Sequence, residues 1–153
     1  MGGKDLDDIV DGAKFLVRAE RVEPTRIGVY GGSYGGFLTA WVISHDHRFK
    51  AAVSQRGVYD MATFFGEGHQ WRMVPETLGG YPWDARFRDI VRRESPFTYV
   101  NRIRTPLLIL HSANDLRVGD AQAQMMYRAL KALNRIAATF LAGAAAVIAT
   151  RAN

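Results

Sequence analysis

The stretch GVYGGSYGGFLTAW, residues 28–41, places Ser33 between two pairs of glycines. The apolar run 27–30 that leads into it is typical of a strand buried on both faces. After Ser33 the apolar side chains recur at helical spacing, at Phe37, Leu38, Trp41 and Val42. Strand, serine and helix follow one another with almost no loop, which predicts a sharp turn at Ser33.

Gly-x-Ser-x-Gly between a strand and a helix is typical of a nucleophile elbow, and here it reads Gly31 to Gly35. The glycines permit a strained turn and close packing of the helix on the strand, so the serine hydroxyl stays exposed at the sheet edge. The alternative is a glycine-rich turn that binds a phosphate or nothing at all. The strand before the motif and the helix after it favour the elbow.

The rest of the chain alternates in the same way. Helical spacing predicts helices over residues 5–20 and 120–133, and short apolar runs predict strands over 49–57, 107–110 and 136–141. Alternating strands and helices imply a parallel sheet with right-handed crossovers. We therefore predict an α/β fold, a partial α/β-hydrolase fold with a mostly parallel sheet of four strands and flanking helices.

Two segments lie outside this alternation. Residues 58–85 are rich in glycine and aromatic residues without a clean period, which predicts a long excursion at the rim of the sheet. Residues 84–94 interleave four arginines with three acids, which is typical of a solvated helix face. The net charge is +5, but no nucleic-acid-binding motif accompanies it, so we expect no nucleic-acid partner.

Length and composition indicate a single domain. The 153 residues, 48% of them hydrophobic, are enough for one buried core. A complete α/β-hydrolase needs well over about 200 residues, at about 30 or more for each βαβ unit. We expect one partial catalytic domain over residues 1–153, in which the residues after about 140 are an atypical tail, as truncation or a frame change would leave.

Several classes of protein are disfavoured. The chain has no cysteine, which excludes disulfides and thiolate nucleophiles, and no metal-ligand cluster or nucleotide loop is present, so we expect no cofactor. The first residues do not resemble a signal peptide. The most apolar run, residues 136–150, is shorter than the roughly 18 to 20 residues of a spanning helix. We expect a cytoplasmic protein without a membrane partner.

Three segments together resemble one family: residues 26–41, 49–60 and 95–118, the last ending in HSANDLRV. They are similar to the catalytic domain of the prolyl oligopeptidase family of serine peptidases, in particular its acylaminoacyl-peptidase and dipeptidyl-peptidase branch. The likeness runs from about residue 3 to about residue 135. It implies peptide substrates and acyl transfer through a serine.

The resemblance also assigns roles to residues. It implies that Ser33 is the nucleophile, that the backbone N–H of Tyr34 is an oxyanion donor and that Asp115 is the acid of the triad. Substrate contacts are implied for Phe64, Trp71 and Val118, the last in the pocket for the P1 side chain.

Asp115 is a candidate acid on the residues alone. It lies just past the end of the strand predicted over 107–110, where open α/β sheets keep functional groups. Triads of this type run Ser, Asp, His in chain order. The alternative is an aspartate that caps a turn or a helix.

The general base is missing from this order. The four histidines, His45, His47, His69 and His111, all precede Asp115. We predict that His111 is a structural or rim histidine, and that the sequence GEGH at residues 66–69 is loop or rim. The glycine-rich loop that gives the family its second oxyanion donor is not found either.

Three functional hypotheses follow. The first is a serine peptidase domain, acyl-peptide hydrolase-like, which we expect to be inactive alone. The second is a non-enzymatic remnant or split subunit, which self-associates or is completed by a partner chain. The third is an α/β-hydrolase esterase, which shares the elbow but not usually the SPFTYV and HSANDLRV segments.

Overall fold

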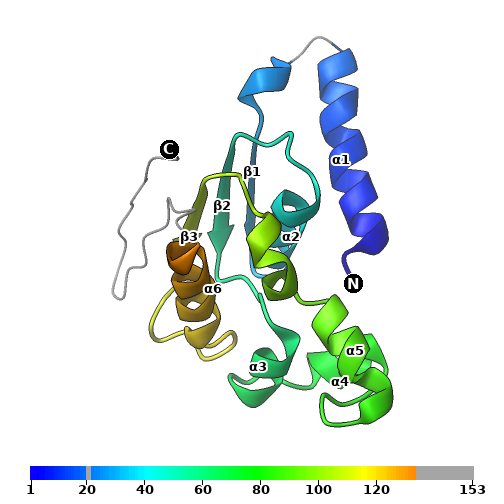
Figure 1. Ribbon diagram of the computed structural model, residues 1–153, viewed down its shortest axis with the longest axis vertical. Helices are drawn as coiled ribbons and strands as arrows, with labels where there is room; N and C mark the ends of the chain where they lie inside the picture. The colour runs from blue at the N-terminus through cyan, green and yellow to red at the C-terminus, as the bar shows by residue number, and fades with distance from the viewer. Residues whose placement is uncertain (20–21, 134–153) are drawn as a thin grey trace.

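A parallel sheet lies at the centre of the computed structural model, which describes residues 1–19 and 22–133. Its strands are β1 (Gly28–Gly32), β2 (Ala51–Gln55) and β3 (Leu107–Leu110). They lie in the order β1-β2-β3, each pair parallel (Figure 1). Three of the four predicted strands are confirmed. The fourth, over residues 136–141, lies outside the described residues.

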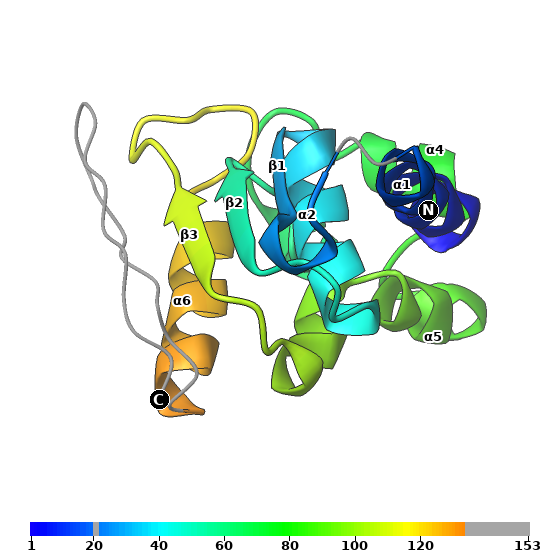
Figure 2. The same cartoon turned by 90° about the horizontal axis from the view of Figure 1, so that it is seen from above.

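Helices cover the sheet and extend beyond its carboxyl edge. The described residues form α1 (Gly3–Arg18), α2 (Tyr34–His45), α3 (Met61–Gly66), α4 (Met73–Leu78), α5 (Ala85–Arg93) and α6 (Ala121–Ala132). Short 3-10 helices span Pro24–Arg26 (η1) and Pro96–Arg102 (η2). Figure 2 shows α2 between the sheet and α1. The helices predicted over 5–20, from Tyr34 and over 120–133 are confirmed.

The predicted excursion is more regular than its sequence indicates. Residues 58–94 contain α3, α4 and α5, which lie below the sheet in Figure 1. Helices α3 and α4 have six residues each, too few to repeat an apolar period, so the pattern gives no helical signal. Helix α5 confirms the helix expected over 84–94, and the Asp84 carboxylate caps it by accepting from Arg86 N at 2.9 Å.

Helix α2 joins two hydrophobic clusters. Ala40, Val42 and Ile43 pack into the cluster with the sheet and α6. Phe37 and Trp41 pack into the cluster with α3, α4 and α5. Burial of each large apolar side chain stabilises the fold by about 1.5–3 kcal/mol. A helix that is apolar on all sides is therefore expected to be buried on all sides, and its position is fixed by both clusters.

A single residue, Ser33, turns the chain from β1 into α2. Its φ of 58° and ψ of −117° are unusual for a residue other than glycine and cost about 1–3 kcal/mol. A Cβ added at Gly36 would lie 2.6 Å from the backbone oxygen of Gln55, so only glycine allows α2 to approach β2 this closely. The predicted sharp turn is confirmed.

Hydrogen bonds hold this turn against β2. Ser33 N donates to Gln55 O at 2.9 Å, and the buried Ser54 Oγ donates to Gly36 O at 2.9 Å. Because the Ser54 proton is used there, the Tyr59 hydroxyl donates to Ser54 Oγ at 2.7 Å. Burial raises the pKa of Tyr59 to about 12, so Tyr59 keeps its proton at neutral pH.

Gln122 of α6 connects this helix to the segment after β2. Its side chain is fully buried, and its Oε1 accepts from Tyr59 N at 2.7 Å and from Asp60 N at 2.9 Å. Its Nε2 donates to Asp60 O at 3.1 Å and to Glu67 Oε1 at 3.0 Å. All four hydrogen-bonding positions of the amide are used.

We predict that Gln122→Ala lowers the free energy of unfolding by about 2–4 kcal/mol, because it leaves two buried backbone N–H groups without an acceptor. Urea denaturation followed by circular dichroism measures this. Gln124→Ala, on the same helix, is the matched control and is expected to cost less than about 1 kcal/mol. Equal losses for the two variants would contradict the role of Gln122.

We also predict that Ser33→Gly stabilises the fold by about 0.5–2 kcal/mol, because glycine adopts positive φ without steric cost. Ser33→Ala keeps the β-carbon and therefore the strain, so its stability is expected to match that of the parent chain. The same urea titration compares the three chains. A Ser33→Gly variant less stable than Ser33→Ala would show that the turn is not strained.

Candidate active site

Ser33 is placed as a nucleophile requires. It is exposed at the carboxyl end of β1, and its side chain does not cap α2 although it occupies the N-cap position. Tyr34 is the first residue of α2, so its N–H belongs to the turn whose amides have no acceptor within the helix. These N–H groups and the positive end of the helix dipole favour a negative charge beside Ser33.

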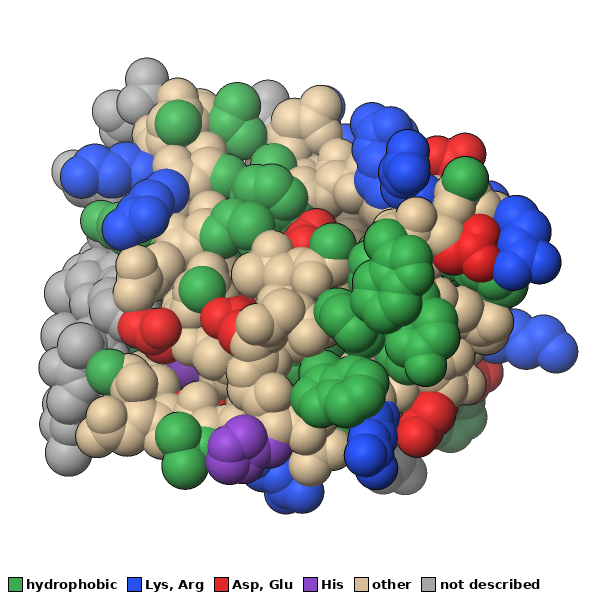
Figure 3. Space-filling model, turned by 90° about the horizontal axis from the view of Figure 1, so that it is seen from below, with side chains coloured by type: hydrophobic (Ala, Val, Ile, Leu, Met, Phe, Trp, Pro, Cys, Tyr) green, Lys and Arg blue, Asp and Glu red, His purple; other side chains and the backbone are tan. Residues whose placement is uncertain are grey.

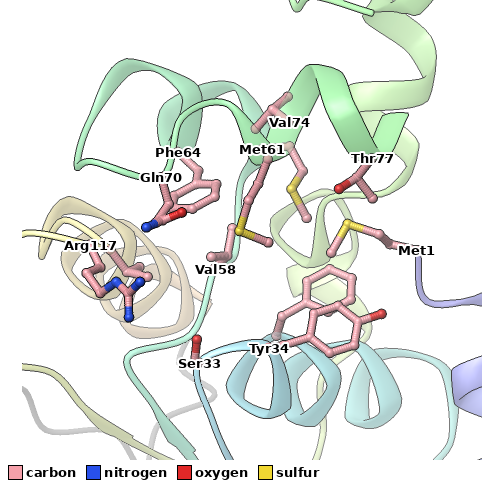
Figure 4. Close-up of a pocket in the computed structure, with 13 residues that line it drawn as sticks. Met1, Ser33, Tyr34, Val58, Met61, Phe64, Gln70, Val74, Thr77 and Arg117 are labelled. Carbon is pink, nitrogen blue, oxygen red and sulfur yellow. The ribbon is translucent and has the colours of Figure 1, made fainter. Parts of the chain in front are cut away.

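A cavity of about 230 Å³ opens beside Ser33, and Figure 4 shows its walls. Most of its lining is apolar. Besides Ser33 and the Tyr34 hydroxyl, its polar side chains are Gln70, Thr77 and Arg117. The remaining residues that line it are Met1, Ser33, Tyr34, Phe37, Val58, Met61, Phe64, Met73, Val74 and Val118. Three of these are methionines, whose unbranched side chains fill irregular spaces readily.

Of the three residues predicted to contact substrate, two line the cavity and one does not. The buried side chains of Phe64 and Val118 line the cavity. Trp71 does not line it: this side chain is 38% exposed and its ring packs edge-on against Phe65, with centroids 5.6 Å apart. Arg117, Gln70 and the methionines carry no sequence signal of their own and were missed.

The ring of Trp71 belongs to a surface cluster of aromatic side chains. Figure 3 shows the hydrophobic groups gathered on the face that carries α3 and α4. Tyr81 and Trp83 stack with centroids 4.5 Å apart, and Phe65 meets both edge-on. The cluster borders the cavity, because two adjacent residues of α3 belong to different sites. Phe64 lines the cavity, whereas Phe65 packs in the cluster.

Asp115 lies in the loop after β3. Since β1 and β3 are parallel strands of one sheet, this loop emerges at the same edge as Ser33. Asp115 Oδ1 accepts from Arg117 N at 2.9 Å and from Val118 N at 3.0 Å. The carboxylate therefore closes the turn of its own loop, and its second oxygen has capacity for a further donor. That Asp115 is the acid partner of Ser33 stays a prediction.

His111 is a structural histidine, as predicted. It is 6% exposed and does not line the cavity beside Ser33. Its Nε2 lies 2.8 Å from Val118 O, and because a carbonyl only accepts, Nε2 carries the proton. Its Nδ1 is buried and finds no partner among the described residues. The hydrogen bond holds the chain next to Asp115.

The segment at residues 66–69 braces the same loop, which a rim assignment alone does not predict. His69 N donates to Leu116 O at 2.8 Å. Gly68 has a φ of 72°, and a Cβ added there would lie 2.5 Å from Arg117 O. Burial raises the pKa of Glu67, while its hydrogen bond from Gln122 partly offsets this effect. The side chain of His69 is exposed.

Helix α1 is fastened to the turn at Ser33 through Tyr34. The Tyr34 hydroxyl donates to Asp5 Oδ2 at 3.1 Å. Partial burial, together with the Asp5 carboxylate, raises the pKa of Tyr34. The side chain directly after Ser33 is thereby held in place.

Two classes of site find no support in the part of the chain that the structure describes. No group of three or more histidine, cysteine, aspartate or glutamate side chains is arranged to hold a metal ion in residues 1–19 and 22–133. Within the same residues no helix combines the length and the hydropathy that a membrane span requires.

Comparisons with known proteins agree with this geometry. The chain is 34% identical over 143 residues to an uncharacterized peptidase of Bacillus subtilis, YuxL, covering 88% of this chain and 20% of that protein. It is 29% identical to the acylamino-acid-releasing enzyme of Rattus norvegicus, covering 88% and 19%. The chain thus spans about a fifth of the length of these relatives.

Solved structures show the same fold. The acylaminoacyl peptidase of Pyrococcus horikoshii superposes with a TM-score of 0.82 at 28% identity, over 93% of this chain and 24% of that one. A puromycin-hydrolyzing peptidase of Mycobacterium tuberculosis superposes with a TM-score of 0.80 at 28% identity, over 92% and 22%. The described elements are therefore part of an α/β-hydrolase fold.

The sequence also matches the model of the prolyl oligopeptidase family over residues 1–142. That range includes the strained turn at Ser33, the loop of Asp115 and the whole described sheet. Three of the relatives named above carry the name peptidase. The chain belongs to the prolyl oligopeptidase family of serine peptidases.

Proposed function

We propose that this chain carries the nucleophile and the acid of a serine peptidase, Ser33 and Asp115. The observation that supports this most strongly is the exposed Ser33, held at positive φ at the start of a buried helix beside an apolar cavity. Strained backbone at the end of a parallel strand is where α/β enzymes place such groups.

The reaction is acyl transfer. Ser33 Oγ attacks the carbonyl carbon of the scissile bond and its proton passes to a general base, while the carbonyl oxygen takes the negative charge. The Tyr34 N–H and the start of α2 stabilise that oxyanion. The base then gives its proton to the leaving amine, and a water hydrolyses the acyl-serine by the reverse pathway. Asp115 orients the imidazole of the base.

The cavity indicates the class of substrate. Its volume of about 230 Å³ and its apolar walls suit one large hydrophobic side chain. Arg117 at its edge offers donors to a backbone carbonyl or a carboxylate of the substrate. We propose short or N-acylated peptides with an apolar residue at the scissile bond. An ester with the same acyl group reacts by the same steps, so an ester serves as a probe but not as the favoured substrate.

We propose that the general base comes from outside these 153 residues. All four histidines precede Asp115, and His111 is committed to Val118 O. Of the described strands, β1 lies at an edge of the sheet, and its Tyr30 is 66% exposed. We propose that further segments or a partner chain pair with an edge of this sheet and supply the histidine. The 153-residue chain alone is then a poor catalyst.

We predict that added imidazole restores part of the activity. The substrate is a p-nitrophenyl ester of an N-acylated apolar amino acid, and its hydrolysis is followed by absorbance. Without imidazole the chain and Ser33→Ala are expected to show the same background rate. With imidazole we expect the chain to exceed Ser33→Ala by at least about tenfold, a fraction of the roughly 10²–10⁴ that a positioned base contributes.

Two outcomes would contradict this proposal. If the imidazole-dependent rate is the same in Ser33→Ala, Ser33 is not the nucleophile. If the chain shows Ser33-dependent turnover without imidazole, and His69→Ala or His111→Ala abolishes it, a histidine within the chain is the base. Asp115→Asn is the matched variant for the acid, and it is expected to lower the rescued rate while the background stays unchanged.

A further inference from the structure

A second hollow lies at the end of α2 away from Ser33. Its volume is about 280 Å³, and it is lined by Ser44, His45, His47, Asn101, Arg102 and Arg104. Helix α2 has 12 residues and is therefore about 18 Å long. The hollow, at the amino-terminal edge of the sheet, is separate from the cavity beside Ser33 and shares no lining residue with it.

Its lining is basic. Two arginines and two histidines contribute to it, and no acidic side chain does. Neither Arg102 nor Arg104 forms a salt bridge with another residue of 1–19 and 22–133. Asp46 directly follows α2, but its two carboxylate oxygens accept from Arg48, each at 2.9 Å. Asp46 is therefore already neutralised by Arg48.

The partial negative charges at the carboxyl ends of α2 and η2 offset this positive charge only in part. Helix α2 ends at His45 and η2 ends at Arg102, so their last carbonyl groups lie close to the hollow. Each carboxyl end of a helix carries about half a negative charge at most. Arg102 and Arg104 together carry two full positive charges, which leaves a surplus even when both histidines are neutral.

Aromatic packing holds two of the basic groups in position. The guanidinium carbon of Arg102 lies 4.9 Å from the centroid of the Tyr99 ring. The centroids of the His45 and Tyr99 rings are 4.7 Å apart. Tyr99 itself is fixed, because its hydroxyl donates to Arg93 O at 3.0 Å. His45 Nδ1 donates to Trp41 O at 2.8 Å, which fixes the orientation of its ring. Such preorganisation lowers the entropy lost on binding.

We propose that this hollow binds the phosphate group of a small molecule. Planar guanidinium groups match the oxygens of a phosphate and bind it through charge-assisted hydrogen bonds. A phosphate monoester carries about −1.5 to −2 charges at neutral pH, more than a carboxylate. It therefore neutralises the positive charge of the two arginines more completely. The volume is just below the roughly 300–1,000 Å³ of small-ligand pockets, which suits a compact phosphate monoester. This inference does not rest on the peptidase proposal.

The test is a titration followed by NMR. Inorganic phosphate and glycerol 3-phosphate are added to the ¹⁵N-labelled chain at constant ionic strength, with acetate as the comparison anion. We expect saturable shifts of the amide signals of residues 44–47 and 101–104, with a Kd of about 1 mM or below for both phosphates. Arg102→Gln and Arg104→Gln are each expected to weaken binding about tenfold, through the loss of hydrogen bonds to a charged group.

Arg88→Gln is the matched control, since Arg88 is an exposed arginine of α5 that does not line the hollow. It is expected to bind phosphate like the parent chain. The proposal is overturned if the shifts do not saturate, if acetate binds as tightly as phosphate, or if Arg88→Gln weakens binding as much as the two hollow variants. All three arginines are exposed, so each variant is expected to keep the fold, and the dispersion of its amide signals checks this.

Discussion

The close approach of α2 to the end of β2 is the constraint on which the candidate site depends. Gly36 lets the helix backbone come within reach of the Gln55 carbonyl, and Ser54 fastens it there through a buried hydrogen bond. Because α2 is fixed at this point and is packed by apolar side chains on all sides, the turn before it cannot relax. The strain at Ser33 is thus maintained by contacts with the neighbouring strand β2. The same contacts fix the start of α2 beside the cavity.

The loop of Asp115 depends on a different part of the fold. Residues 67–69 lie between β2 and β3 in the chain, yet they contact residues 116–119 through His69 N, Gly68 and Glu67. Gln122 then ties Glu67 to α6, and His111 ties the end of β3 to Val118. Ser33 is therefore positioned by the sheet, whereas Asp115 is positioned by the helical excursion. A change in the excursion affects Asp115 and the cavity wall at Val118 together.

The elbow and the strands were predictable because their signals are local. Two glycine pairs around Ser33, and the short apolar runs near 51–55 and 107–110, need no tertiary information. Helices α3 and α4 were not predictable, because they are stabilised by burial of Phe64 and Val74 rather than by a period of their own. The cavity and the basic hollow were not predictable either, because each collects side chains from segments far apart in the chain, such as His45 and Arg104.

The order of the strands has a consequence for how the protein reaches its native state. Residue Ala52 of β2 pairs with Leu107 of β3, so the central strand gains its second neighbour only after the whole helical excursion has been synthesised. Pairings between residues so distant along the chain form slowly, because closing the long loop costs conformational entropy before the stabilising contacts form. The anchors of Ser33 on β2 therefore mature late. We therefore expect Ser33 to reach its strained geometry only after synthesis has passed β3, because β2, to which it is hydrogen-bonded, lacks its second neighbour until then.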